Sequence, residues 1–342
     1  MTPETAIQGR GWQWLRLFWV GVLLLFGGGA VILQRLGPPA SPLAEAGGEP
    51  IAQVEPAAPA PALRLLSGVP EALRRHVDQA LTEPSVHGPL PRLGVDGRSP
   101  MRAYARSFDR QDPRPRVALI LGGMGLNHGL SEQAIRSLPP EVALAFNPYA
   151  ANPVALLDQA RTRGFETLLA LPLEPTGFPL NDPGERALLT GLPAGENAGR
   201  LEWLLARFPG HVGAVGALGA MRGERFAALT EPFSQMQLAL AARGLLYFDP
   251  RPGVSSPQRA WGRTVDVLVD EPPTRAEIDL RLAQIERQAR ERGGALGYLG
   301  DVSPVALQRI TAWADGLESR GVALAPVSAV MRRPDAAAAT LR

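Results

Sequence analysis

RVALILGGMGLNHG, Arg116–Gly129, joins an aliphatic run to a cluster of glycines. Val117–Leu121 has the β-branched and aliphatic composition of a buried strand in a parallel α/β sheet or barrel. The glycines that follow predict a tight turn at the end of this strand. Because chemistry in such folds sits where strands end and loops begin, the next residues should carry function. They are Gly122, Gly123 and Met124, and none of them is an acid, a base or a metal ligand.

Downstream of this stretch, short apolar runs alternate with amphipathic stretches. Such alternation predicts parallel strands joined by right-handed helical crossovers, and seven or eight units favour a closed or nearly closed barrel over an open sheet. The expected strands are Val117–Leu121, Val142–Phe146, Thr167–Leu171, Val212–Ala217, Leu245–Asp249, Val265–Val269, Ala295–Leu299 and Val322–Pro326. The expected helices lie near Ser131–Ser137, Pro153–Arg163, Glu196–Phe208, Pro232–Arg243, Thr274–Arg292 and Pro304–Arg320.

Composition narrows the functional classes. The chain has 342 residues, of which 45% are hydrophobic, so it can form one large domain with additional segments. It has no cysteine, which excludes disulfides, thiolate metal sites and cysteine nucleophiles. Its net charge is only +2, its 35 basic residues are all arginine, and there is no long basic run. We therefore expect no nucleic-acid partner.

Leu17–Leu33 is uncharged and just long enough to cross a bilayer as a helix. Arg10 and Arg16 precede it and Arg35 follows it, so the positive-inside rule places the N-terminus in the cytoplasm. We therefore expect a single-pass protein of a bacterial inner membrane, with its C-terminal domain in the periplasm. The alternative is a cleaved signal peptide with Ala44–Ala46 as the cleavage motif.

The segment between this apolar run and the barrel is rich in proline. Gly37–Ala62 has few large apolar residues and predicts an extended linker. Pro70–Leu81 can form one short amphipathic helix, and Thr82–Arg114 is expected to be irregular. The expected organisation is therefore a cytoplasmic tip and transmembrane anchor, a linker with one helix, a barrel domain and a disordered tail, over residues 1–36, 37–114, 115–332 and 333–342.

Two motifs near the first strand are candidate binding sites. The glycines in Gly123–Gly129 resemble a dinucleotide fingerprint, but the second strand ends in Phe146, Asn147 and Pro148 rather than in an acid. A tight strand-to-helix turn is the simpler interpretation. His128 in that turn is interpreted as a solvated loop residue rather than as a ligand.

Carboxylates follow several of the predicted strands. Glu174, Asp249, Asp270 and Asp301 should all lie at the C-terminal rim, and Asp266 shares the parity of Asp270 on the sixth strand. Such a group can do acid–base work or hold a cation. The same carboxylates can instead cap helices or pair with nearby arginines, for which the candidates are Arg251, Arg263 and Arg275.

Eight segments in this order resemble the divergent polysaccharide deacetylase family of bacterial envelope proteins, over roughly Met101–Met331. They are VALILGGMG, ALAFNPYA, GFETLLALPLEP, GHVGAVGALGAM, ARGLLYFDPR, VDVLVD, GALGYLG and GVALAPVSAVM. The resemblance implies a distorted (β/α) barrel of the carbohydrate-deacetylase type. It also implies metal-dependent removal of N-acetyl groups from a polysaccharide.

The chain departs from the family where that chemistry would occur. The family's paired aspartates fall on Gly122 and Gly123, and its histidines and asparagines fall on Ala170, Val215, Gly216, Ala217 and Leu299. Acidic positions of the pattern are kept at Glu174, Asp249 and Asp266.

We therefore expect a membrane-anchored protein without catalytic, metal or cofactor residues, which binds glycan, such as a peptidoglycan fragment, or an envelope protein. The candidate ligand-binding residues are Glu174, Asp249, Asp266 and Asp270. The alternatives are a hydrolase of N-acetylated polysaccharide that uses the remaining rim carboxylates and, more weakly, a nucleotide-binding module.

Overall fold

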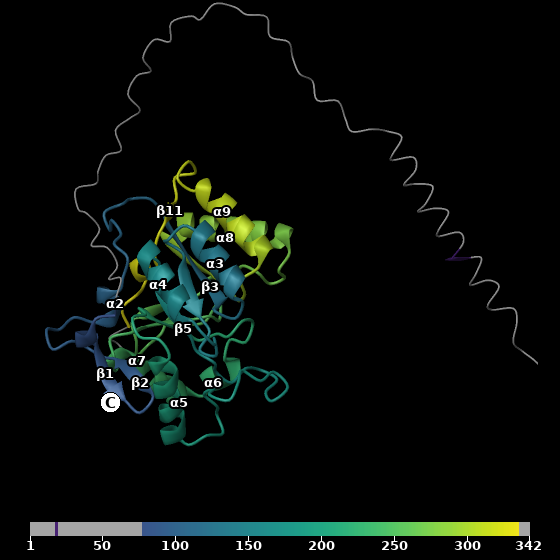
Figure 1. Cartoon of the computed structure of the whole chain (residues 1–342). Helices are drawn as coiled ribbons and strands as arrows, with labels where there is room; N and C mark the ends of the chain where they lie inside the picture. Colours follow the sequence, from purple (N-terminus) through teal and green to yellow (C-terminus); the bar gives the residue numbers. More distant parts are fainter. Residues whose placement is uncertain (1–17, 20–76, 335–342) are drawn as a thin grey trace, which may run out of the picture. The chain divides into compact units, whose positions relative to one another are not determined.

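The computed structural model describes residues 18–19 and 77–334 (Figure 1). Apart from residues 18 and 19, the expected membrane segment lies outside the described residues, as do Gly37–Ala62, most of Pro70–Leu81 and residues 335–342. Within the described residues, no helix has the length and apolar character that a bilayer crossing requires.

Nine strands form one parallel sheet, which confirms the α/β class predicted from the sequence. In sheet order the main path runs β8-β7-β6-β5-β4-β3-β10-β9, and β11 pairs with β3 beside it. The strands are β3 (Arg116–Met124), β4 (Ala143–Phe146), β5 (Thr167–Ala170), β6 (Gly213–Val215), β7 (Leu246–Asp249), β8 (Gly262–Thr264), β9 (Val267–Leu268), β10 (Gly294–Leu299) and β11 (Ala323–Leu324).

One short segment joins the two ends of this sheet order. β8 pairs with β7, β9 pairs with β10, and only two residues separate β8 from β9. Val265 N donates to Asp249 O on one side, and Asp266 N donates to Leu296 O on the other. The sheet therefore curls into a distorted barrel. The prediction of one continuous strand over Val265–Val269 was wrong, because the hydrogen-bond partner changes in the middle of that apolar run.

The strand that opens the barrel is longer than predicted. β3 continues through Gly122 and Gly123 to Met124, which pairs with Phe146, and the register shifts between Leu121 and Met124. The two glycines therefore lie in an irregular strand end, and the predicted turn begins only afterwards. Gly123 has a φ of 70°, a left-handed conformation that glycine adopts easily.

The expected helices are confirmed, with shifts of a few residues at most of their ends. They are α3 (His128–Ser137), α4 (Val154–Arg163), α5 (Ala194–Ala206), α7 (Thr230–Ala242), α8 (Arg275–Arg292) and α9 (Pro304–Asp315), with a short α6 (Glu224–Ala228) before α7. α8 begins and ends as its sequence predicts. The Thr274 side chain accepts from Glu277 N, and Gly293 ends the helix with a φ of 79°.

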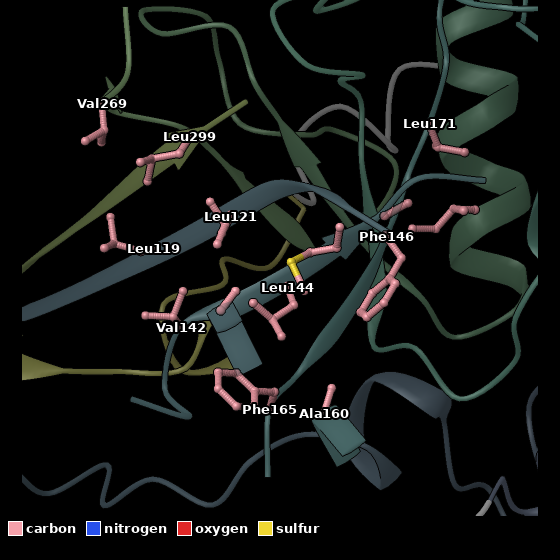
Figure 2. Close-up of a cluster of buried hydrophobic side chains, with 14 of the residues drawn as sticks. Leu119, Leu121, Val142, Leu144, Phe146, Ala160, Phe165, Leu171, Val269 and Leu299 are labelled. Atoms are coloured by element: carbon pink, nitrogen blue, oxygen red, sulfur yellow. The ribbon is translucent and has the colours of Figure 1, made fainter. Parts of the chain in front are cut away.

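Two apolar layers hold the barrel together, because strands covered on both faces bury every side chain. In β3, the odd-numbered Val117, Leu119 and Leu121 pack outward in the layer beneath the helices. Figure 2 shows part of this layer, where side chains of neighbouring strands cluster. The even-numbered Ala118 and Ile120 belong to a second cluster inside the barrel.

Within residues 82–114, where we expected irregular chain, the structure has regular elements, and the end of the predicted helix Pro70–Leu81 is a 3-10 turn. A 3-10 turn (Gln79–Leu81) leads into the antiparallel pair β1 (Thr82–Ser85) and β2 (Gly88–Pro91), and α2 (Pro100–Ala103) follows. The prediction was wrong because proline disfavours central strands, whereas this pair is an isolated two-stranded ribbon that tolerates it. Leu81 and Tyr104 belong to the cluster inside the barrel.

His211 lies just before β6 and is buried. We therefore expect the free energy of unfolding to depend on pH. Its pKa is lowered to about 4, chiefly by burial and also by the charge of Arg161, while a hydrogen bond with Phe208 O opposes the shift. The folded pKa is below the ordinary value near 6.5, so the unfolded chain takes up the proton first and stability falls as pH falls. Between pH 6.5 and 5 this histidine should remove about 2 kcal/mol from the free energy of unfolding.

The measurement is urea unfolding at pH 7 and pH 5 for the wild type and for His211→Asn, which keeps a donor for Phe208 O but does not titrate. The variant should lose less stability on acidification. An equal loss in both proteins would show that other groups cause the pH dependence.

Candidate functional site

The carboxyl ends of the parallel strands form the rim at which the sequence predicts function. Glu174 lies in the loop after β5, Asp249 is the last residue of β7, and Asp301 follows β10. Asp270 follows β9. The structure therefore places these four acids after strand ends, but their partners differ.

Glu174 and Asp249 hold rim loops in place. The Glu174 carboxylate accepts from Thr190 N and Oγ1 and lies 2.9 Å from Arg225 Nε. The Asp249 carboxylate accepts from Arg251 Nε at 2.9 Å and Arg251 Nη2 at 2.6 Å. Each acidic side chain is only 3% exposed. Their oxygens are therefore occupied by the protein itself.

Asp266 does not lie with the rim acids. It precedes the two-residue β9, and its Oδ2 accepts from Arg263 Nη2 at 2.9 Å and from Leu296 N at 2.8 Å. Arg292, at the C-terminal end of α8, is 3.7 Å from its Oδ1. The expectation that Asp266 and Asp270 share one face of a single strand fails because the strand is broken beside Asp266. Arg263 is thus the ion-pair partner of Asp266, in agreement with the alternative that the acids pair with nearby arginines.

Asp270 organises the loop after β10. Its Oδ2 accepts from Gly300 N at 2.8 Å and from Asp301 N at 3.2 Å. Burial raises the pKa of Asp270, and these two backbone hydrogen bonds oppose the shift. Asp301 itself is exposed. The two acids therefore differ, because Asp270 is committed to the backbone and Asp301 faces solvent.

Tyr298 fills the mouth of the barrel. Its ring is buried in the cluster inside the barrel, and its hydroxyl donates to Gly219 O at 3.1 Å. Burial raises the pKa of Tyr298, as do the nearby charges of Asp270 and Asp301, so the phenol stays neutral. Sequence reasoning missed this residue, although a tyrosine at an inward position between Gly297 and Gly300 was a usable signal.

The glycines at the mouth allow close approach of backbone to backbone. A Cβ on Gly122 would lie 2.6 Å from Gly300 O and 2.9 Å from the Tyr298 hydroxyl. A Cβ on Gly300 would lie 2.9 Å from the carbonyl carbon of Gly219. The turn after β6 therefore lies directly on the end of β10. The space that a side chain at position 122 would need is already filled.

An ion pair ties the same turn to the opposite loop. Arg222 Nη1 donates to Glu271, and Arg222 Nε lies 3.5 Å from Glu224. The site therefore contains the buried Tyr298 hydroxyl, whose hydrogen is bonded to Gly219 O, and rim acids most of which have protein partners. Within residues 18–19 and 77–334, no three His, Cys, Asp or Glu side chains are grouped as a metal ion requires.

The glycine motif after β3 has a structural explanation. Gly125 N donates to Ser131 Oγ, and Leu130 N donates to the Asn127 side chain, which caps α3. A Cβ on Gly125 would lie 2.7 Å from the Ala150 Cβ. Gly125 is thus needed for packing. The two amides that would face a phosphate, those of Gly125 and Leu130, already donate to side chains of the protein. His128, the first residue of α3, lies 3.4 Å from Glu132.

Comparison with known proteins gives three results. The family model for divergent polysaccharide deacetylases matches residues 119–331. The uncharacterized protein ATU2773 from Agrobacterium tumefaciens C58 shares 35% identity over 71% of this chain and 99% of its own, with a TM-score of 0.66. The search of curated proteins gave no significant match.

Two solved deacetylase-type structures are more distant. A T48 deacetylase with substrate is 9% identical over 66% of this chain and 94% of its own, with a TM-score of 0.42. A family 4 carbohydrate esterase from Streptomyces lividans in complex with acetate is 13% identical over 66% of this chain and 99% of its own, with a TM-score of 0.41.

Proposed function

The chain belongs to the divergent polysaccharide deacetylase family, and we propose that it is a non-catalytic member that binds glycan or a protein partner in the bacterial envelope. The filled barrel mouth carries this proposal. Tyr298 and Gly300, which contact the turn at Gly219, are packed against Gly122, the position on which the first of the family's paired aspartates falls.

A metal of the kind that the family implies does not fit these residues. Zinc in proteins relies on His, Cys and carboxylate ligands, and a deacetylase metal must also polarise an acetyl carbonyl. Position 122, which would carry one ligand, is a glycine whose Cβ would lie 2.6 Å from Gly300 O. Of the rim acids, Glu174 and Asp249 are paired with arginine.

The location forms part of the proposal and rests on the sequence. The uncharged run Leu17–Leu33 and the arginines before it support a single inner-membrane anchor with the barrel in the periplasm. A reporter fused after Arg342 should be active only in the periplasm. Activity of a cytoplasmic reporter would overturn this orientation.

One observation favours hydrolysis as a second candidate. Asp301 is exposed beside Asp270, and burial raises the pKa of Asp270, so that a buried carboxyl suited to general-acid work lies next to an exposed one. Such an enzyme would act on N-acetylated polysaccharide without the metal of the family.

Acetate release and metal content distinguish the two candidates. We expect the purified protein to hold no stoichiometric zinc, to keep its thermal melt in chelator, and to release no acetate from N-acetylated glycans with added Zn²⁺, Co²⁺ or Ni²⁺. Metal-independent acetate release that Asp301→Asn abolishes would establish the hydrolase instead. One equivalent of tightly held zinc, together with deacetylation, would overturn the conclusion that a metal does not fit these residues.

A further inference from the structure

A groove runs between α5 and α7. Two cavities of about 510 and 360 Å³ share the lining residues Ala198, Leu201 and Ala239. One extends toward the loop before α5, and the other reaches Glu83 and Arg92 beside the β1–β2 pair. Figure 1 shows α5, α7 and this pair in the same part of the molecule. The two cavities therefore form one groove along both helices.

The floor of the groove is apolar and its walls are small. Leu188, Leu201, Phe226 and Met236 line the floor and are nearly inaccessible. The walls include Gly195, Ala198, Ala239 and Ala242, whose short side chains leave the helix backbones open to close approach.

The glycines of α5 have no packing role in the described residues. A Cβ on Gly195 or Gly199 would meet nothing within 4 Å. Glycine is also a poor helix former, so the fold gains nothing from it at these positions. An apolar floor between two helices with small walls is the geometry in which amphipathic helices bind.

The accessible charge along this groove is acidic. Of the glutamates that line it, Glu83 and Glu202 have side chains that are 41% and 48% exposed, and Glu231 is also exposed. Arg92 and Arg243 also line the groove. Arg243 is 18% exposed, lies 2.7 Å from Glu83 and 3.9 Å from Glu202, and donates to Pro91 O. A ligand in the groove would therefore meet the exposed carboxylates of Glu202 and Glu231, which are more accessible than Arg243.

We propose that this groove binds a basic amphipathic helix of a partner protein. Its apolar side chains would lie on Leu201 and Met236, and its lysines or arginines would face Glu202 and Glu231. α5 has 13 residues and is therefore about 20 Å long, which matches a partner helix of about four turns. Leu188 and Phe226 of its floor hydrogen-bond to Glu174 at the rim, but neither Tyr298 nor Gly219 lines the groove, so the inference does not depend on what the barrel mouth binds.

The test uses the full chain and a fluorescently labelled synthetic peptide of 18 residues, with leucine on one helical face and lysine on the other. We expect saturable binding that weakens at least tenfold in Ala198→Trp, which blocks the junction of the two cavities, and in Glu202→Lys/Glu231→Lys. Added salt should also weaken binding, because the charges are exposed.

Ala283→Trp is the matched control, since Ala283 is an exposed alanine in a different groove on α8. It should leave binding unchanged, and thermal melts should show that every variant is folded. Equal binding to Ala198→Trp, equal binding of a glutamate-faced peptide, or no binding at all would overturn the proposal. So would a dimer of the full chain that Ala198→Trp dissociates, because the occupant would then be a second copy.

Discussion

Glu166→Ala is expected to lower the free energy of unfolding by about 4 kcal/mol. Glu166 is 1% exposed. Its carboxylate accepts from Arg106 N at 2.8 Å, from Ser328 N at 3.1 Å and from Ser328 Oγ. Alanine would leave these donors without an acceptor, and each buried unsatisfied group costs about 1–3 kcal/mol.

The effect is large because Glu166 joins three distant parts of the chain. It lies just before β5, whereas Arg106 belongs to the segment before the barrel and Ser328 lies in the 3-10 turn Val327–Ala329 near the end. Chemical unfolding measures the loss. Glu141→Ala is the control, since Glu141 also contacts Arg106 but is partly exposed, and it should cost less than about 1 kcal/mol. Similar losses in both variants would contradict the role of burial.

Gly122→Asp, which introduces the acid of the family at this position, is expected to cost about 3 kcal/mol and to create no metal site. The new Cβ would overlap Gly300 O and the Tyr298 hydroxyl. Because one of these is a backbone atom, a change of side-chain rotamer cannot relieve the clash. The strand end must shift, and that shift would disrupt the Tyr298–Gly219 hydrogen bond.

Unfolding in urea and zinc titration calorimetry test this prediction together. Gly191→Asp is the matched control, because a Cβ there meets nothing within 4 Å and its change in stability should be within about 0.5 kcal/mol. If Gly122→Asp is as stable as this control, the mouth has more room than the structure shows. If Gly122→Asp gains zinc affinity, the conclusion that a metal does not fit the rim residues is wrong.

The sequence predicted the elements whose signals are local. Thr274 and Gly293 mark the ends of α8 because capping depends on residues within one turn of each other. The break between β8 and β9 could not be predicted, because it arises when Val265 bonds to β7 and Asp266 to β10. An apolar run carries no information on which strand will pair with each of its residues.

The same distinction applies to the site. The order of elements predicted which acids follow strand ends, and the Asp249–Arg251 pair lies two residues apart in the sequence. The partners of Glu174 come from Thr190 and Arg225, which only the fold brings together. Tyr298 was missed because its role depends on contact with Gly219, which lies in the loop after β6, on another side of the barrel.

The pairing of β3 also governs when the protein can fold during its synthesis. β3 begins at Arg116, but one of its edges pairs with β10, which begins at Gly294, and the start of its other edge pairs with β11, which begins at Ala323. A nascent chain that ends before Gly294 therefore contains the first barrel strand with one edge unpaired and its apolar side chains uncovered. Contacts this far apart in the sequence form slowly and leave incomplete chains prone to aggregation. We therefore expect prematurely terminated products to be aggregation-prone and unfolded rather than weaker versions of the domain.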